Sequence, residues 1–150
     1  MRRPRLRFPV GLLAIACAVS ADLPPEPALP WLRSPDLHGD RVVFVCEGDL
    51  WLGELSTAKA SRLTRGDGPE SEPRFSPDGK QIAFSGTYDG VSEIYLIPTG
   101  GGAPRLLTYR NLTADPLDWT PDGQHVVFRA PDYPRPWTLW TVPQGGGFPR

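Results

Sequence analysis

The sequence of 150 residues is poor in residues that carry redox or metal chemistry, with two cysteines, two histidines and one methionine. Cys17 lies in an N-terminal segment that we expect to be removed, which leaves Cys46 without a partner for an internal disulfide. Cys46 ends the apolar run Val42–Cys46, a position that favours a buried, unreactive thiol. His38 and His125 have no cluster of further ligands at zinc spacing. We therefore predict no metal site, and interpret both histidines as solvated residues beside turns.

Helical patterns are also missing. Beyond the first twenty residues, no stretch gives three uninterrupted turns of apolar residues at helical spacing. The 19 prolines and 16 glycines fall at regular positions between short apolar runs. In those positions they predict turns between strands. The sequence therefore predicts an all-β fold.

Motifs for catalysis and phosphate binding are absent as well. No serine lies in a Gly-x-Ser-x-Gly motif, and the triplets Gly100–Gly102 and Gly145–Gly147 lack the spacing of a nucleotide loop. We predict that both triplets are hairpin tips. Asp78 and Asp122 each precede a glycine in a turn, where an aspartate bonds its own backbone, and Asp40 is interpreted in the same way. We predict no catalytic, cofactor-binding or metal-binding residue, and no cofactor, in this chain.

The N-terminus has the pattern of a secretory signal peptide. Four arginines precede the apolar stretch Phe8–Val19, and Ser20 and Ala21 are small residues at the cut. Twelve apolar residues are too few to span a bilayer stably. We predict a signal peptide at 1–21, a proline-rich linker at 22–30, and a periplasmic or secreted product. Lipidation of Cys17, whose preceding residues resemble a lipoprotein box, is one alternative, and a cytoplasmic location is another.

The charge balance argues against a nucleic-acid partner. Removing the four arginines of the signal from the 16 basic residues leaves 12, against 17 acidic residues. A protein that binds nucleic acid needs a basic surface to neutralise phosphates. We therefore predict that the mature chain does not bind nucleic acid.

A ten-residue segment recurs after 44 residues. Phe75–Phe84 returns as Trp119–Phe128, and both copies contain Pro-Asp-Gly before a run of strand-forming residues. A period of about 40–50 residues is typical of β-propeller blades, each a small sheet of four antiparallel strands. We predict an incomplete propeller at 31–150, about two and a half blades long. The expected blades are 31–64, 71–108 and 115–150, and the third would break off as its last strand opens at Phe148.

Each blade has two apolar faces that neighbouring blades must cover. Trp51, Tyr95 and Trp140 recur at one position of the repeat, and we predict that they fill the core between blades. Because the third blade has no following neighbour, we expect Phe128, Trp137 and Trp140 to be partly exposed, with aggregation of the isolated chain.

Two loops are the best candidates for binding. Tyr88–Gly90 lies in a loop expected at Gly86–Gly90, and Asp132–Pro136 lies in a loop expected at Ala130–Pro136. These loops connect the second and third strands of their blades, and their lengths differ between repeats. Loops on a rigid scaffold commonly carry binding residues. Asn111–Thr113 matches a glycosylation sequon, on which no prediction is built.

The repeats also resemble a known family. Pro73–Gly86, preceded by Arg62-Leu63-Thr64, is similar to the PD40 repeat of TolB-like proteins and several peptidases. The first repeat, His38–Val45 followed by Glu47–Leu52, closely resembles the N-terminal propeller of tricorn-type proteases, as do Tyr88–Gly90 and Trp119–Gly123. The resemblance covers residues 31–150.

This resemblance implies a larger enzyme. Tricorn-type proteases combine a six-bladed and a seven-bladed propeller, a PDZ-like domain and a serine-protease core of the tail-specific class. They cleave oligopeptides, and their propellers are thought to gate passage to a chamber. The catalytic serine and histidine belong to the core, and no position here matches them. The founding enzymes resemble cytosolic proteins, whereas this chain begins with an export pattern.

We therefore expect an exported, tricorn-like serine peptidase of which this chain supplies a non-catalytic propeller portion that gates or guides peptides. Its partners would be peptides, the remaining blades and the protease domains, with assembly into a homo-oligomer left open. One alternative is a non-catalytic TolB-like binding propeller of the cell envelope. TolB-like proteins place a separate domain ahead of their propeller, however, and here the first blade follows the predicted cut by about ten residues. A propeller fused to an α/β-hydrolase peptidase is the other alternative, and the His38-Gly39-Asp40 opening favours the tricorn type over it.

Overall fold

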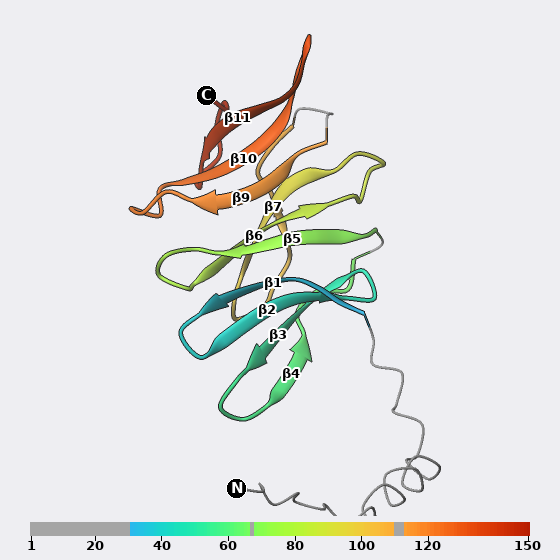
Figure 1. The fold of residues 1–150 in the computed structure, drawn as a ribbon, viewed down its shortest axis with the longest axis vertical. Helices are drawn as coiled ribbons and strands as arrows, with labels where there is room; N and C mark the ends of the chain where they lie inside the picture. The colour runs from blue at the N-terminus through green and yellow to red at the C-terminus, as the bar shows by residue number, and fades with distance from the viewer. Residues whose placement is uncertain (1–30, 67, 110–112) are drawn as a thin grey trace, which may run out of the picture.

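The computed structural model describes residues 31–66, 68–109 and 113–150, and all regular structure in these ranges is β-strand. The strands form three antiparallel sheets that are stacked along the long axis of the molecule (Figure 1). Each sheet corresponds to one predicted repeat, so the all-β, unclosed propeller is confirmed. No helix in the described part of the chain is long and apolar enough to cross a membrane.

Blade 1 is a four-stranded meander in which each strand pairs with the next one in sequence. The last strand was predicted to end at Thr64 and ends two residues earlier. The amides of Leu63 and Thr64 both donate to the carbonyl of Leu50 instead, at 2.8 and 3.3 Å. The strands are β1 Leu32–His38, β2 Arg41–Cys46, β3 Asp49–Glu54 and β4 Lys59–Arg62.

Blade 2 repeats this meander. Its Pro-Asp-Gly turn joins the first two strands, with Gly79 at a φ of +65° that suits glycine and disfavours residues with a Cβ. The outermost strand is reduced to two residues, opposite Tyr95 and Leu96. The strands are β5 Glu70–Phe75, β6 Gln81–Gly86, β7 Glu93–Pro98 and β8 Arg105–Leu106.

Blade 3 has three assigned strands, β9 Asp115–Trp119, β10 His125–Asp132 and β11 Arg135–Pro143. The loop predicted at Ala130–Pro136 is wrong, since β10 and β11 continue to a tight turn. Pro131 suggested a loop, but it lies at an irregularity in the ladder between Ala130 and Asp132, where a proline is tolerated. The predicted fourth strand only begins, with Arg150 and Thr141 exchanging backbone hydrogen bonds of 2.8 and 2.9 Å.

The apolar cores lie between blades. One core joins blade 1 to blade 2 and contains the fully buried side chains of Leu50 and Phe84. The other joins blade 2 to blade 3 and contains Ile94 and Phe128, also fully buried. Because alternate residues of a strand point to opposite faces, β7 supplies Tyr95 to the first core and Ile94 to the second.

The three recurring aromatic residues have different surroundings. Tyr95 is buried in the first core, and Trp140 packs against the second, as predicted. The prediction fails for Trp51, which is only half-buried. Its neighbour Leu50 points toward blade 2, so Trp51 points to the opposite face of blade 1, where the described residues include no preceding blade.

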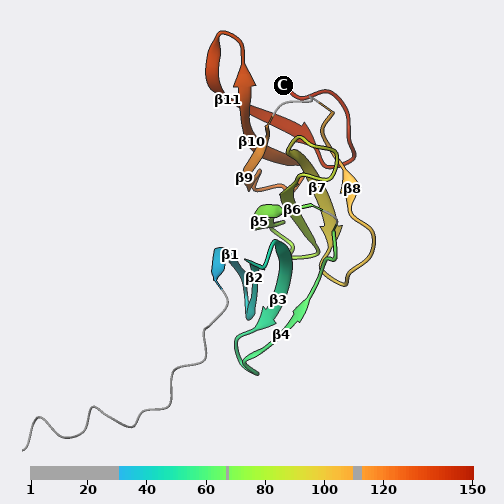
Figure 2. The same cartoon turned by 90° about the vertical axis from the view of Figure 1, so that its right-hand side faces the viewer.

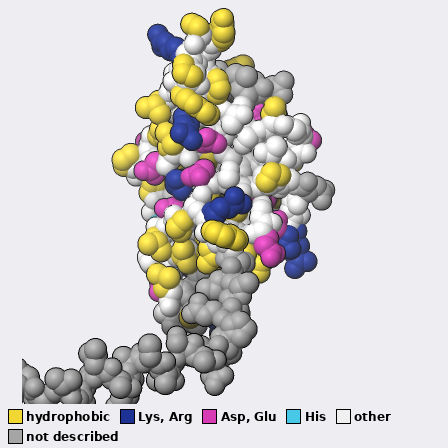
Figure 3. Space-filling view, turned by 45° about the vertical axis from the view of Figure 1, so that its right-hand side comes forward, with side chains coloured by type: hydrophobic (Ala, Val, Ile, Leu, Met, Phe, Trp, Pro, Cys, Tyr) yellow, Lys and Arg dark blue, Asp and Glu magenta, His cyan; other side chains and the backbone are white. Residues whose placement is uncertain are grey.

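The expected exposure at the far end of the stack also needs correction. Phe128 is fully buried, because it faces blade 2 and not the open end. Trp137 and Leu139 are exposed apolar residues within the strands of the final hairpin, at 48% and 68%. Figure 3 shows hydrophobic side chains gathered at the end of the molecule where β10 and β11 lie.

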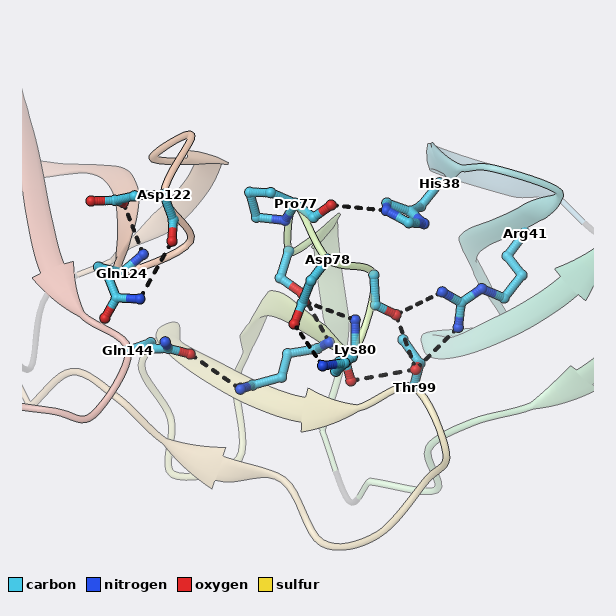
Figure 4. Close-up of polar contacts among 12 residues, drawn as sticks. His38, Arg41, Pro77, Asp78, Lys80, Thr99, Asp122, Gln124 and Gln144 are labelled. Atoms are coloured by element: carbon cyan, nitrogen blue, oxygen red, sulfur yellow. Dashed lines mark hydrogen bonds and ion pairs between the residues drawn. The ribbon is translucent and has the colours of Figure 1, made fainter.

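Polar contacts join the turns along one side of the stack (Figure 4). His38 Nε2 lies 3.0 Å from the carbonyl of Pro77, and Arg41 Nη2 donates to the carbonyl of Gly79 at 2.7 Å. His38 lies directly before the turn at Gly39 and Asp40 and is partly exposed, and it also contacts the neighbouring blade. Asp40 lies in the predicted turn, and its carboxylate accepts a 3.1 Å bond from the amide of Ser56 in the next turn of its blade.

Candidate functional site at the junction of blades 1 and 2

A cavity of about 640 Å³ lies between blades 1 and 2. One wall is the segment that leads from β4 to β5, and the other comes from the β6–β7 loop and the outer strands of blade 2. The predicted binding loop Tyr88–Gly90 contributes two residues to this cavity. The lining residues are Leu63, Thr64, Arg65, Gly66, Glu70, Tyr88, Asp89, Tyr95, Gly102 and Pro104.

Two glycines allow the walls to approach closely. A Cβ on Gly66 would lie 2.5 Å from the ring of Tyr88, and a Cβ on Gly68 would collide with the backbone of Thr87. Side chains at these two positions would push the β4–β5 segment away from the β6–β7 loop. The Gly-rich sequence of this segment therefore fixes the position of Tyr88 at the cavity.

Glu70 is the buried acidic residue of the site, with 2% of its surface exposed. One carboxylate oxygen accepts bonds from the Leu50 amide, at 3.0 Å, and from the Thr64 hydroxyl, and the other accepts a bond from the Tyr88 hydroxyl. Burial raises the pKa of Glu70, because the charged form loses solvation, although these three donors oppose the shift. The carboxylate thus joins blade 1, the connecting segment and the β6–β7 loop.

The two tyrosines form an aromatic wall. The rings of Tyr88 and Tyr95 meet edge to face, with centroids 4.7 Å apart. Burial raises the pKa of both hydroxyls, and for Tyr88 the bonded carboxylate of Glu70 raises it further, so both stay protonated at neutral pH. Arg65 and Asp89 are exposed, which gives the lining one solvated charge of each sign.

These groups suit binding and not bond cleavage. Neither histidine nor cysteine lines the cavity, and the buried Thr64 hydroxyl donates to Glu70 while accepting the Leu50 amide at 2.9 Å. A nucleophile needs a base beside it and donors for an oxyanion. The cavity instead offers aromatic surface and a charge of either sign, which are features of a binding pocket.

A second cavity of about 650 Å³ lies at the next junction, between blades 2 and 3. Leu107 and Tyr109 occupy the positions of Leu63 and Arg65, 44 residues later. Ala114 replaces Glu70, as shown by the matching amide bonds from Glu70 to Gly48 O and from Ala114 to Ser92 O, both 2.9 Å. Glu70 therefore has no acidic counterpart at its own repeat position in the second junction, where Thr108 donates to the buried Glu93 instead.

The other predicted binding loop does not join this site. Tyr133, at the tip of the β10–β11 hairpin, is 98% exposed, and the hairpin projects at the upper end of the molecule in Figure 1. The guanidinium of Arg129 lies over the Trp137 ring, 4.8 Å from its centroid. The sequence suggested two candidate loops; Tyr88 and Asp89 of the first line the cavity at the junction of blades 1 and 2, and no residue of the second does.

Asp78 and Asp122 are confirmed as turn residues. Their carboxylates accept bonds from the amides of Lys80 and Gln124, at 3.1 and 3.0 Å, within their own turns. A hydroxyl donor, Ser76 for Asp78 and its counterpart Thr120 for Asp122, is the main cause of the lowered pKa of each carboxyl. The glycine triplets follow β7 and β11 as hairpin turns, and Cys46 is a buried free thiol.

Some predicted features cannot be located. Residues 1–30, with the signal peptide, Cys17 and the linker, and Asn111 of the sequon lie outside the described ranges. Within the described ranges, no group of three or more histidine, cysteine, aspartate or glutamate side chains is arranged to hold a metal ion.

Sequence reasoning missed Glu70, although one observation pointed near it. Thr64 and Thr108 recur 44 residues apart. Each hydroxyl accepts the amide that begins the apolar part of a third strand, Leu50 or Ile94, at 2.9 Å. The recurrence of these threonines marks the junctions, but Glu70 itself resembles an ordinary polar loop residue in sequence.

The stacked antiparallel sheets, two with four strands and one with three, define the class of protein as a β-propeller. Residues 30–150 match the family described as the tricorn protease N-terminal beta propeller domain. The chain is 39% identical to the tricorn protease homolog 1 of Streptomyces coelicolor over 101 residues, which are 66% of this chain and 10% of that protein.

Solved structures agree with this match. A crystal structure of the tricorn protease superposes with a TM-score of 0.66 at 27% identity, covering 78% of this chain and 13% of that one. TolB from Acinetobacter baumannii gives a TM-score of 0.69 at 21% identity, with 78% and 31% covered, which shows a shared fold. The chain therefore belongs to the tricorn protease N-terminal propeller family, and it spans about a tenth of the length of its tricorn homolog.

Proposed function

We propose that this chain is the peptide-contacting propeller portion of an exported, tricorn-like serine peptidase. The observation that carries the proposal is the cavity at the first junction, where a family-matching loop brings Tyr88 and Asp89 to an aromatic wall. The chain itself contributes binding and guidance of peptides, and bond cleavage belongs to other domains of a longer protein.

Peptide binding is tested with a fluorescent library of four- to eight-residue peptides on the full 150-residue chain. We expect Tyr88→Ala and Asp89→Ala to weaken binding at least fivefold. Trp31→Ala is the matched control, because Trp31 is 88% exposed and does not line the cavity. Equal losses in the control, or no loss in either cavity variant, would remove the proposal.

The peptidase activity and the location need separate tests. Hydrolysis of the same peptides by the longer protein, blocked by a serine-directed inhibitor, would support the enzyme. A longer protein that binds peptides without cleaving them would favour the TolB-like alternative, which the shared fold supports. The mass of the mature N-terminus in a periplasmic extract distinguishes cleavage after Ala21 from lipidation at Cys17.

A further inference from the structure

The first strand of each blade forms an open edge of its sheet. β1, β5 and β9 each pair on one side only, and they contact one another from blade to blade. Figure 2 shows these three strands along one side of the stack. Blades of a propeller surround a central channel, so this row of open edges is its wall. An open edge offers unpaired amides and carbonyls to any extended peptide.

The donors on this edge are removed or occupied. Pro73 in β5 has no backbone N–H, and neither has Pro35 in β1 or Pro116 in β9. The amide of Phe75 donates to Asp36 Oδ2 of blade 1 at 2.7 Å. At the same position of blade 3, the amide of Trp119 donates to Asp118 Oδ1, also at 2.7 Å.

The side chain of one arginine donates hydrogen bonds to two backbone carbonyls on this edge. Arg74 Nη1 donates to the carbonyl of Pro73 at 2.8 Å, and its Nε donates to the carbonyl of Leu117 in blade 3 at 3.0 Å. Trp119 Nε1 in turn donates to the carbonyl of Arg74 at 3.1 Å. Side chains therefore take up backbone groups that an added strand would need.

Further side-chain contacts hold the guanidinium of Arg74 in place. Glu72 accepts a 3.0 Å bond from Arg74 Nη2 and a 2.8 Å bond from the hydroxyl of Ser34 in blade 1. Ser34 and Glu72 have φ values of 47° and 49°, and both lie at register irregularities of their strands. Bulges of this kind are a known device against edge-to-edge pairing.

We propose that Asp36, Arg74 and the prolines of the inner strands cap the channel wall, so that an extended peptide passes along it without being captured as an added strand. This inference rests on the proposed function, since it specifies how the same propeller treats its peptides. Retention then comes from side-chain sites such as the junction cavity, and transit follows the capped edge.

The test removes the side chain that covers the Phe75 amide and measures whether a probe peptide then binds through its backbone. The probe is a fluorescein-labelled hexapeptide of alternating valine and threonine, with a copy methylated on alternate backbone nitrogens. We expect Asp36→Ala to bind the unmodified probe at least tenfold more tightly than the wild-type chain does, and methylation to abolish the gain. Asp36→Asn keeps an acceptor for the Phe75 amide, so its affinity should match the wild type.

Arg74→Gln is the second variant, because it exposes the acceptors of Pro73 and Leu117 and leaves the Phe75 amide covered. It should show a smaller gain with the same sensitivity to methylation. Unchanged affinity in correctly folded Asp36→Ala and Arg74→Gln chains would overturn the inference. Wild-type binding that already falls tenfold on methylation would overturn it too. Failure of the proposed function would appear instead as unchanged binding in the Tyr88→Ala cavity variant, a result independent of the Asp36 comparison.

Discussion

The hydroxyl of Tyr88 donates a hydrogen bond to the buried carboxylate of Glu70 and so joins the β6–β7 loop to the segment between blades 1 and 2. Removing only this hydroxyl by Tyr88→Phe should cost about 1.5–3 kcal/mol of unfolding free energy, the range for a bond to a charged group. Urea unfolding measures the cost. Tyr133→Phe, at a 98% exposed position, is the control and should change nothing. Equal stabilities of the two variants would contradict this role.

Glu70 should make stability depend on pH. Its pKa in the folded chain is raised above 4.5 by burial, so its contribution is intact below that pH and is lost as pH rises through the raised pKa. Glu70→Gln removes the titration. The stability of the variant relative to wild type should therefore increase from about pH 4.5 upward and then level off. Thermal melts from pH 4 to 8 test this, and a constant or falling difference would contradict it.

The recurring threonines should act as junction anchors. Thr108 accepts the buried amide of Ile94 at 2.9 Å and donates to Glu93. Thr108→Val keeps the shape and leaves the amide without this acceptor, which should cost about 1–3 kcal/mol. Thr113→Val, at an exposed position, is the matched control for loss of a hydroxyl. We would abandon the anchor role if chemical denaturation gave both variants the same midpoint.

Equivalent positions in two blades should differ, because the described residues place a further blade after the second blade and none after the third. Ile94 pairs with Ser85 and is fully buried, whereas Leu139 pairs with Arg129 at the corresponding place and is 68% exposed. Ile94→Ala should cost about 2–5 kcal/mol in the 150-residue chain. Leu139→Ala should cost less than about 1 kcal/mol and should reduce aggregation, followed by light scattering. Comparable destabilisation by both changes would show that a surface covers Leu139.

Local patterns in the sequence predicted much of this fold. The Pro-Asp-Gly turns at Asp78 and Asp122 are determined by the chemistry of a few adjacent residues, so they could be placed without a structure. The short apolar run Val42–Cys46, rich in β-branched residues, likewise forms a strand, β2. The loop expected at Ala130–Pro136 was wrong because proline composition does not reveal a bulge within a continuing strand.

Features that depend on neighbouring blades could not be predicted in the same way. Trp51 occupies the same repeat position as Tyr95 and Trp140, but its burial requires a blade on the side opposite Leu50. Glu70 is surrounded by polar residues in sequence and becomes buried only when Tyr88, 18 residues later, packs over it. The cap formed by Asp36 and Phe75 joins residues 39 apart, and no period of the repeat indicates it.

Residue-resolved hydrogen exchange of the 150-residue chain tests the central claim, that three blades stack with their inner edges capped by neighbouring blades. The amide of Phe75 is the decisive one, because it donates its hydrogen bond to an aspartate of blade 1. We predict that this amide exchanges at least a hundredfold more slowly than in an unstructured peptide, and that Asp36→Ala abolishes the protection. Exchange of the Phe75 amide at the unstructured rate in the folded wild-type chain would contradict the account.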